Sequence, residues 1–387
     1  MSDGLPAPRR YGAIAAVLIA IFMSMLDGSL LNVALPSIAT DLSISDATVI
    51  WLVNGYQLML LLAVLPIAAL GESLGFRRIF VMGAALFFFS SLICITASGW
   101  QVLLAGRLLQ GLGSAAILSV TPPLLRLIYP SAQLGRGIAL NALTVALSVA
   151  CGPTIAAAVL TVASWPWLFV AGLPLSALAL LLSSKLPRSI CQESRLDLAG
   201  VILNILTFGL FALGIDRLSR APSFAVALLL AAIFLGVVFW KTERRKHRPL
   251  IPFDLLEDRN CAFAVATSFF IWCGQIIAFV ALPFYLQRHA GLDLLATGMV
   301  LTAWPLAIAA FSPIAGWLVE RMQTATLATI GSCLFSISLL CIVIATVSDT
   351  IFLTGLLASG GLGFCLFQIP NNRAIITSAP IERSGVT

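Results

Sequence analysis

The chain has 387 residues, of which 60% are hydrophobic and 10% are charged, and its formal net charge is +6. Its mean hydropathy of +1.05 excludes a soluble globular domain of ordinary composition. The eight cysteines and two histidines are scattered and show neither metal-ligand spacing nor a disulfide framework. We therefore expect a membrane protein with no metal site.

The apolar residues gather in runs of about twenty, which is the length that an α-helix needs to cross a bilayer. Backbone groups in hydrocarbon must bond to each other, and runs of this length do so as helices. The sequence therefore predicts an all-α fold, a polytopic membrane helical bundle with about twelve transmembrane helices. In chain order the predicted spans are residues 12–35, 49–70, 79–98, 102–125, 137–160, 165–184, 198–215, 222–240, 262–286, 295–319, 325–347 and 351–371.

The basic residues are distributed unevenly between the two sides of these spans. Among the 22 Lys and Arg, only Arg217, Arg220 and Arg288 fall in loops opposite the N-terminus. The positive-inside rule then predicts a cytoplasmic N-terminus. The basic run at 241–260 is interpreted as a cytoplasmic linker, because no aromatic residues interleave with its charges as they would in a nucleic-acid site. We expect a lipid bilayer, and no nucleic acid, as a partner.

The stretch "IFMSMLDGSLLNVALPSIATDL" places Asp27 inside the first apolar run. A charge at mid-bilayer costs about 2.5–3.5 kcal/mol or more, so such residues are usually paired or functional. Asp27 could brace a neighbouring helix. It could instead be a protonatable carboxylate that lines a central cavity, where a proton and a cationic substrate would compete for one charge.

Two short turns suggest an internal repeat. The segment "LGESLGFRRIF" follows the second span and "AGWLVERMQ" follows the tenth, and both place Gly, an acid and Arg between helices. Transporters often consist of two such repeated halves. A short cytoplasmic turn also collects Gly and Arg without any repeat, so this pattern alone leaves both interpretations open.

Five motifs in a fixed order carry a family resemblance: "LDGSLLNVALPSIATDL", "GESLGFRR", "LLAGRLLQGLGSAA", "SVACGPTIAAAV" and "WPWLFVAGLP". The chain resembles the major facilitator superfamily, and most of all its fourteen-helix drug:proton antiporter group. The resemblance implies three parts, which are an N-terminal six-helix bundle at 1–190, two extra linker helices at 191–245 and a C-terminal bundle of four helices at 246–387. The chain therefore looks C-terminally truncated relative to that group.

The same resemblance implies roles for individual residues. Asp27 and Arg107 would couple transport to protons, although Arg107 could instead be structural or snorkel to an interface. Gating and conformational roles would fall to Gly71, Glu72, Gly75, Arg77, Arg78, Gly152 and Pro153. The Gly152-Pro153 pair could equally form a static kink.

Polar and aromatic side chains on the spans are candidates for a substrate cavity, and each could instead hydrogen-bond between helices. They are Asn32, Asn54, Tyr56, Gln57, Gln110, Asn141, Trp272, Gln275 and Trp304.

The predicted function is proton-coupled export of hydrophobic cationic drugs across the inner membrane by alternating access. The proton gradient would drive it without a cofactor, and its partners would be a lipophilic cation, protons and lipid. The alternatives are an uptake carrier for a small organic solute and a non-transporting truncated fragment. An enzyme is not expected, because the sequence shows neither a nucleophile with a base nor a phosphate-binding loop.

Overall fold

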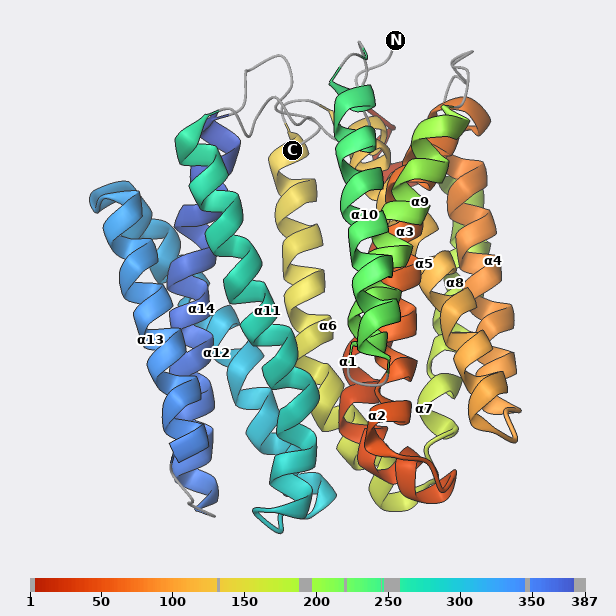
Figure 1. Cartoon of the computed structure of the whole chain (residues 1–387). Helices are drawn as coiled ribbons and strands as arrows, with labels where there is room; N and C mark the ends of the chain where they lie inside the picture. The colour runs from red at the N-terminus through yellow and green to blue at the C-terminus, as the bar shows by residue number, and fades with distance from the viewer. Residues whose placement is uncertain are drawn as a thin grey trace. The chain divides into compact units, whose positions relative to one another are not determined.

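The computed structural model describes residues 4–130, 133–187, 197–218, 221–244, 246, 258–344 and 349–378. Within these ranges every regular element is a helix and no strand occurs (Figure 1). Twelve of these segments are long and apolar enough to cross a membrane. The predicted all-α fold with twelve membrane-length helices is confirmed.

The helices extend beyond most of the predicted spans. The first eight α-helices and one 3-10 turn are α1 (Ala7–Asp41), α2 (Asp46–Val49), α3 (Trp51–Leu74), α4 (Phe76–Ile95), α5 (Trp100–Ile128), α6 (Leu134–Val162), α7 (Trp167–Val170), α8 (Gly172–Leu182) and η2 (Ser183–Lys185). The remaining helices are α9 (Leu198–Arg217), α10 (Pro222–Glu243), α11 (Arg259–Arg288), α12 (Leu294–Arg321), α13 (Thr324–Ile344) and α14 (Thr350–Ser378).

The sixth predicted span differs from the structure, because a continuous helix over 165–184 was expected. A turn at Ala171 instead separates α7 from α8. Pro174 has no N–H to donate to the carbonyl of Val170 four residues earlier, so the helical ladder is interrupted at this point.

The predicted tight turn between the second and third spans is present between α3 and α4. Gly75 has a φ of +96°, a conformation that residues with a Cβ adopt rarely. Its N–H donates to the carbonyl of Gly71 at 3.0 Å. Glu72 and Arg78 are exposed and Arg77 is half-buried. The two glycines therefore have a structural reason to be here, and a gating role for this turn stays a prediction.

The chain divides into two compact units. The first unit contains residues 1–24, 47–144 and 169–253, and the second contains residues 25–46, 145–168 and 254–387. Helices α1 and α6 each contribute segments to both units. The α9 and α10 pair belongs to the first unit.

One close helix crossing occurs in both units. In the first unit, a Cβ added to Gly111 of α5 would lie 2.4 Å from the carbonyl oxygen of Tyr56 on α3. In the second unit, a Cβ added to Gly361 of α14 would lie 2.4 Å from the carbonyl oxygen of Trp304 on α12. Only glycine permits backbones to approach this closely.

A second crossing repeats in the same way. A Cβ added to Gly83 of α4 would lie 2.9 Å from the carbonyl oxygen of Gly113, and one added to Gly331 of α13 would lie 2.7 Å from that of Gly363. Gly83 follows Tyr56 by the same number of residues as Gly331 follows Trp304. The two units therefore share one packing pattern, which supports the internal repeat.

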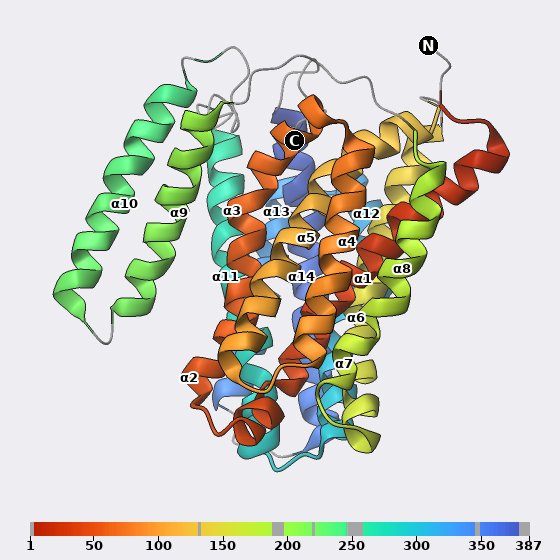
Figure 2. The same ribbon diagram turned by 90° about the vertical axis from the view of Figure 1, so that its right-hand side faces the viewer.

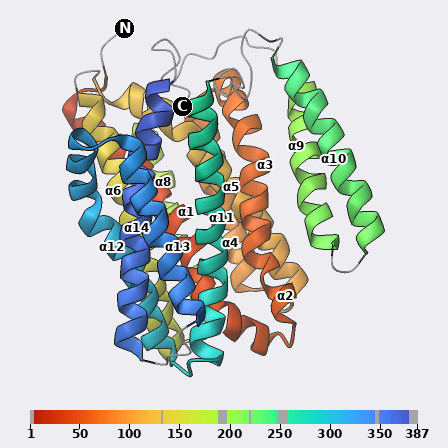
Figure 3. The same ribbon diagram turned by 60° about the vertical axis from the view of Figure 1, so that its left-hand side comes forward.

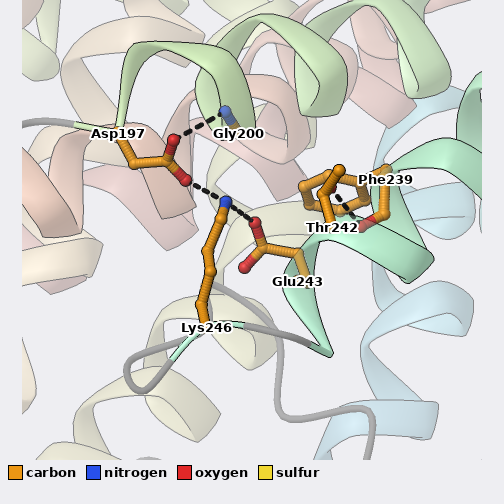
Figure 4. A network of polar contacts seen from close by, with 6 residues as sticks. All are labelled: Asp197, Gly200, Phe239, Thr242, Glu243 and Lys246. Atoms are coloured by element: carbon orange, nitrogen blue, oxygen red, sulfur yellow. Dashed lines mark hydrogen bonds and ion pairs between the residues drawn. The ribbon is translucent and has the colours of Figure 1, made fainter.

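Helices α9 and α10 form an antiparallel hairpin in the first unit (Figure 2). Asp197 precedes α9, and its carboxylate accepts a hydrogen bond from the N–H of Gly200 at 3.1 Å. The Lys246 ammonium donates to Asp197 and to Glu243 at the end of α10 (Figure 4). Lys246 therefore links the start of α9 to the end of α10.

The cluster shifts the pKa values of the half-buried Asp197 and Lys246 side chains. Burial by itself raises the pKa of the Asp197 carboxyl, but the hydrogen bonds from Lys246 and Gly200 outweigh burial and hold that pKa below its ordinary value. Burial by itself lowers the pKa of Lys246, but its bonds to Asp197 and Glu243 raise it overall. Both shifts favour the charged forms of Asp197 and Lys246 at neutral pH.

We expect Lys246→Met to lower the free energy of unfolding by about 1.5–3 kcal/mol at pH 7, because the variant removes the cation that bonds to Glu243, whose side chain is completely buried. Asp197 has its lower pKa in the folded state, so its contribution is present above the unfolded value of about 3.9 and is lost as the pH falls through the folded value. The difference between variant and parent should therefore shrink in acid. Thermal melting of the purified protein in detergent from pH 7 to pH 3 measures it.

Lys241→Met is the matched control, because Lys241 is exposed in the last turn of α10 and forms no ion pair with the described residues. A Lys246→Met effect of constant size across this pH range would contradict the assignment.

Candidate functional site

Asp27 lies deep in α1, and its side chain is only 7% exposed. It is twenty residues from Ala7 and fourteen from Asp41, which correspond to about 30 Å and 21 Å along the helix. The carboxylate is therefore far from both ends of an apolar segment, where charged side chains are expensive and usually functional.

Helix α6 contacts α1 beside Asp27. The hydroxyl of Ser29 donates to the carbonyl of Leu26 at 2.9 Å and lies 3.4 Å from the carbonyl oxygen of Ser148 on α6. A Cβ added to Gly152 would lie 1.9 Å from Ser29 Oγ. Gly152 is therefore required for this close approach.

The neighbouring part of α6 also packs against α12 within the second unit. A Cβ added to Gly298 of α12 would lie 2.7 Å from the carbonyl oxygen of Pro153. The hydroxyls of Thr154 and Thr302 are 2.6 Å apart. The Gly152-Pro153 segment is thus packed on both sides, and its role as a hinge stays a prediction.

Arg107 of α5 is completely buried. Its Nη1 donates to Gln110 Oε1 at 2.6 Å and its Nε donates to the carbonyl of Leu52 at 3.2 Å. The guanidinium lies 4.5 Å from the ring centroid of Tyr56 and 5.8 Å from that of Phe169. Because arginine does not deprotonate in proteins, this arrangement holds a fixed positive charge between aromatic faces.

Gln110 extends the contacts of Arg107 to α4. Its Nε2 donates to the hydroxyl of Ser91 at 3.0 Å, and that hydroxyl donates in turn to the carbonyl of Phe87 at 2.8 Å. The thiol of Cys94 lies 3.6 Å from Gln110 Oε1. The arginine is therefore linked to two neighbouring helices of the first unit.

The hydroxyl of Tyr56 connects the same site to α1. It lies 3.0 Å from the carbonyl oxygen of Ser24, 3.2 Å from Ser24 Oγ and 2.7 Å from Ser114 Oγ. Ser24 precedes Asp27 by about one turn of α1. The polar network around Arg107 therefore reaches the helix that carries the buried acid, one turn before it.

Sequence reasoning missed Ser24, Ser91 and Ser114, because single serines are common in transmembrane runs. One usable signal was present. Arg107, Gln110 and Ser114 follow a spacing of three and then four residues, which places all three on one face of a helix.

The equivalent crossing in the second unit, between α12 and α14, has an apolar residue in place of Arg107. Four residues before the crossing glycine, Leu357 stands where the first unit has Arg107, and it is fully buried. The ring of Trp304 meets those of Phe279 and Phe335, each at 5.5 Å between centroids. The second unit therefore has an aromatic cluster where the first has a polar network.

The other predicted cavity residues are dispersed. Asn54 and Gln57 are exposed, whereas Gln275 and Trp304 are buried. Asn32 donates to the carbonyl of Gly28 in its own helix at 3.4 Å. Asn141 is half-buried, and the partly exposed Trp272 ring meets Phe364 edge to face at 5.2 Å. Tyr56 and Gln110 belong to the Arg107 network. Substrate contact stays a prediction for all nine residues.

A polytopic helical protein with two similarly packed units and ionisable side chains buried in its spans has the architecture of a membrane transporter. Residues 17–387 match the Major Facilitator Superfamily, and the chain belongs to this family.

Similar proteins include transporters of different stated roles. The chain is 42% identical to YebQ, an uncharacterized transporter of Escherichia coli strain K12, over 99% of this chain and 85% of the relative. It is 26% identical to the riboflavin transporter RibZ of Clostridioides difficile strain 630, over 97% and 83%. It is 29% identical to the multidrug resistance protein Stp of Mycobacterium tuberculosis strain H37Rv, over 95% and 69%.

Solved structures share the fold at low sequence identity. A bacterial homolog of the human lysosomal transporter Spinster, in an inward-facing and unoccupied conformation, has a TM-score of 0.68 at 14% identity and matches over 99% of this chain and 78% of that one. A peptide transporter POT in complex with sulfate has a TM-score of 0.68 at 14% identity, over 96% and 83%.

We expect Gly152→Ala to lower the free energy of unfolding by about 1–3 kcal/mol, because the added methyl group would overlap Ser29. Gly209→Ala on α9 is the control, since no atom lies within 4 Å of its added Cβ. It should be neutral, or stabilising by up to about 1 kcal/mol. Thermal melting of both purified variants tests the contact, and equal melting temperatures would contradict it.

Two substitutions distinguish the contribution of the Tyr56 hydroxyl from that of its ring. Tyr56→Phe should cost about 1 kcal/mol through the lost hydroxyl contacts. Tyr56→Leu should cost a further 0.5–2 kcal/mol or so through the lost cation–π contact. That additional loss should shrink in an Arg107→Met background, where only the lost ring packing remains, and an undiminished loss there in melting measurements would refute the contact.

Proposed function

We propose that the protein is a proton-coupled exporter of hydrophobic cationic molecules that works by alternating access, within the fourteen-helix drug:proton antiporter group. The observation that carries this proposal is the burial of Asp27 deep in α1. The proton gradient would drive the cycle without a cofactor.

Asp27 is assigned the proton-binding and cation-attracting role. A carboxylate inside an apolar bundle is neutralised either by a proton or by a nearby cation. If both use the same carboxylate in turn, binding of a cationic substrate displaces the proton and proton binding displaces the substrate. Exchange of protons for drug across the membrane follows from this competition.

Arg107 is assigned a coupling role through the network that surrounds it. Its charge does not titrate, and its contacts join α5 to α3 and α4. The Tyr56 hydroxyl continues these contacts to Ser24, about one turn before Asp27. A change of charge at Asp27 therefore occurs about one turn from a serine that is hydrogen-bonded to Tyr56 of α3.

The proposed class of substrate is supported by aromatic residues and by similarity to named transporters. The partly exposed Trp272 offers a ring face of the kind that binds organic cations. Trp304 and Gln275 are buried in this structure, so they would have to become accessible during the transport cycle to contact a substrate. A similar protein is named a multidrug resistance protein, which supports drug export, although the relative named a riboflavin transporter keeps a small organic solute open. We place the protein in the inner membrane, with its N-terminus and the basic 241–260 segment in the cytoplasm.

Asp27→Asn should abolish efflux driven by a pH gradient while leaving membrane insertion intact, because Asn keeps the size of Asp but cannot change charge. The measurement is release of ethidium from energised membrane vesicles that contain equal amounts of each variant. Efflux should fall to the rate of vesicles that lack the protein.

Asp293→Asn is the matched control. Asp293 lies at the start of α12 and accepts a hydrogen bond from the N–H of Ala296 at 2.7 Å, and Asn serves equally well in such a cap. Unchanged efflux by Asp27→Asn would remove Asp27 from the mechanism. Inward accumulation of the solute by the parent protein would instead support the uptake carrier.

A further inference from the structure

A proline in α3 leaves one backbone carbonyl without its helical partner. Pro66 has no N–H, so the carbonyl of Leu62, four residues earlier, receives no hydrogen bond within the helix. In hydrocarbon no water replaces that bond, and an unpaired carbonyl is costly. Some other donor within the protein must reach Leu62.

The donor comes from α9. Asn204 is completely buried, and its Nδ2 donates to the carbonyl of Leu62 at 3.1 Å. A carbonyl only accepts hydrogen bonds, so the part of the amide that faces it is the NH2 group. The amide oxygen of Asn204 is buried without a hydrogen-bond partner among the described residues. The hydrogen bond to Leu62 therefore offsets part of the free-energy cost of burying the polar Asn204 side chain.

A second polar contact fixes the register of the same two helices. The Trp51 indole N–H donates to Asp216 Oδ1 at 2.9 Å. Trp51 and Leu62 are about 16 Å apart along α3, and Asp216 and Asn204 are about 18 Å apart along α9. Helices α3 and α9 lie beside each other (Figure 3). The near-equal spacings show that these antiparallel helices are joined in register at two points.

The part of α3 between these attachments supplies the surroundings of Arg107. Leu52 provides the carbonyl that accepts from Arg107 Nε, and Tyr56 provides the ring beneath the guanidinium. The position of both groups therefore depends on how α3 is held along its length.

We infer that Asn204 is a positioning residue, which pairs the carbonyl freed by Pro66 and thereby holds α3 in the register that presents Leu52 and Tyr56 to Arg107. The α9 and α10 pair is then a brace for α3 and not only a connection between the two halves. The docking itself is independent of what the protein transports, whereas its effect on the pH dependence of efflux rests on the proposed function.

A double-mutant cycle tests this inference. Asn204→Leu removes the donor at similar size. Pro66→Ala restores an N–H at position 66, which bonds to the carbonyl of Leu62 inside α3 and makes Asn204 dispensable. Thr207→Val is the matched control, because Thr207 lies one turn along α9 and its buried hydroxyl has no partner among the described residues.

The first readout is the melting temperature of the purified full chain in detergent. Asn204→Leu should lower it by about 2 °C or more, and by less than half as much in the Pro66→Ala background. Thr207→Val should leave it unchanged. An equal loss in both backgrounds, or an equal loss in the Thr207→Val control, would overturn the docking assignment.

The second readout is the pH midpoint of ethidium efflux from vesicles, which a purely structural contact would not move. Asn204→Leu should shift this midpoint, and adding Pro66→Ala should return it to the parent value. An unchanged midpoint alongside a positive melting cycle would overturn the positioning role.

Two further outcomes remain decisive. If Asn204→Leu fails to accumulate in membranes, recovery in the double variant supports the inference and continued absence overturns it. If the parent protein shows no gradient-driven efflux, the proposed function fails, while the melting cycle still decides whether α9 docks through Asn204.

Discussion

Glycines allow close contacts between helices in this protein, and Asp27 and Arg107 lie beside two of these contacts. Gly111 brings α5 onto α3 at Tyr56, and Arg107 lies one turn away on α5, where it can stack on that ring. Gly152 brings α6 onto α1 beside Asp27. Both ionisable side chains are therefore placed by backbone packing, because helices in hydrocarbon associate by close fit and not by a hydrophobic force.

The same helix crossing occurs in both units, but the side chains beside it differ in charge. Gly361 meets Trp304 in the second unit just as Gly111 meets Tyr56 in the first, yet Leu357 occupies the place of Arg107. The crossing thus tolerates either a charge or a methyl group at the same position. Packing at this crossing is common to both units, whereas the charge at this position occurs only in the first unit.

Hydropathy was sufficient to predict the twelve spans, because length and apolarity alone determine whether a segment can cross a bilayer. Local patterns could not predict contacts between helices. The role of Asn204 depends on its proximity to Leu62. An amide or serine in an apolar run looks the same whether it binds a substrate or a neighbouring backbone. The sequence therefore indicated that Asp27 and Arg107 are exceptional, but not what surrounds them.

The hairpin of α9 and α10 also has a consequence for sidedness. Lys246 bonds to both Asp197 and Glu243, so the chain enters the hairpin and leaves it at neighbouring points. Two crossings return the chain to the side of the bilayer from which it started, so α11 enters from the same side as α9. A single helix at this place would have inverted the direction of all the helices that follow. A hairpin is thus the smallest membrane-crossing segment that leaves their direction unchanged.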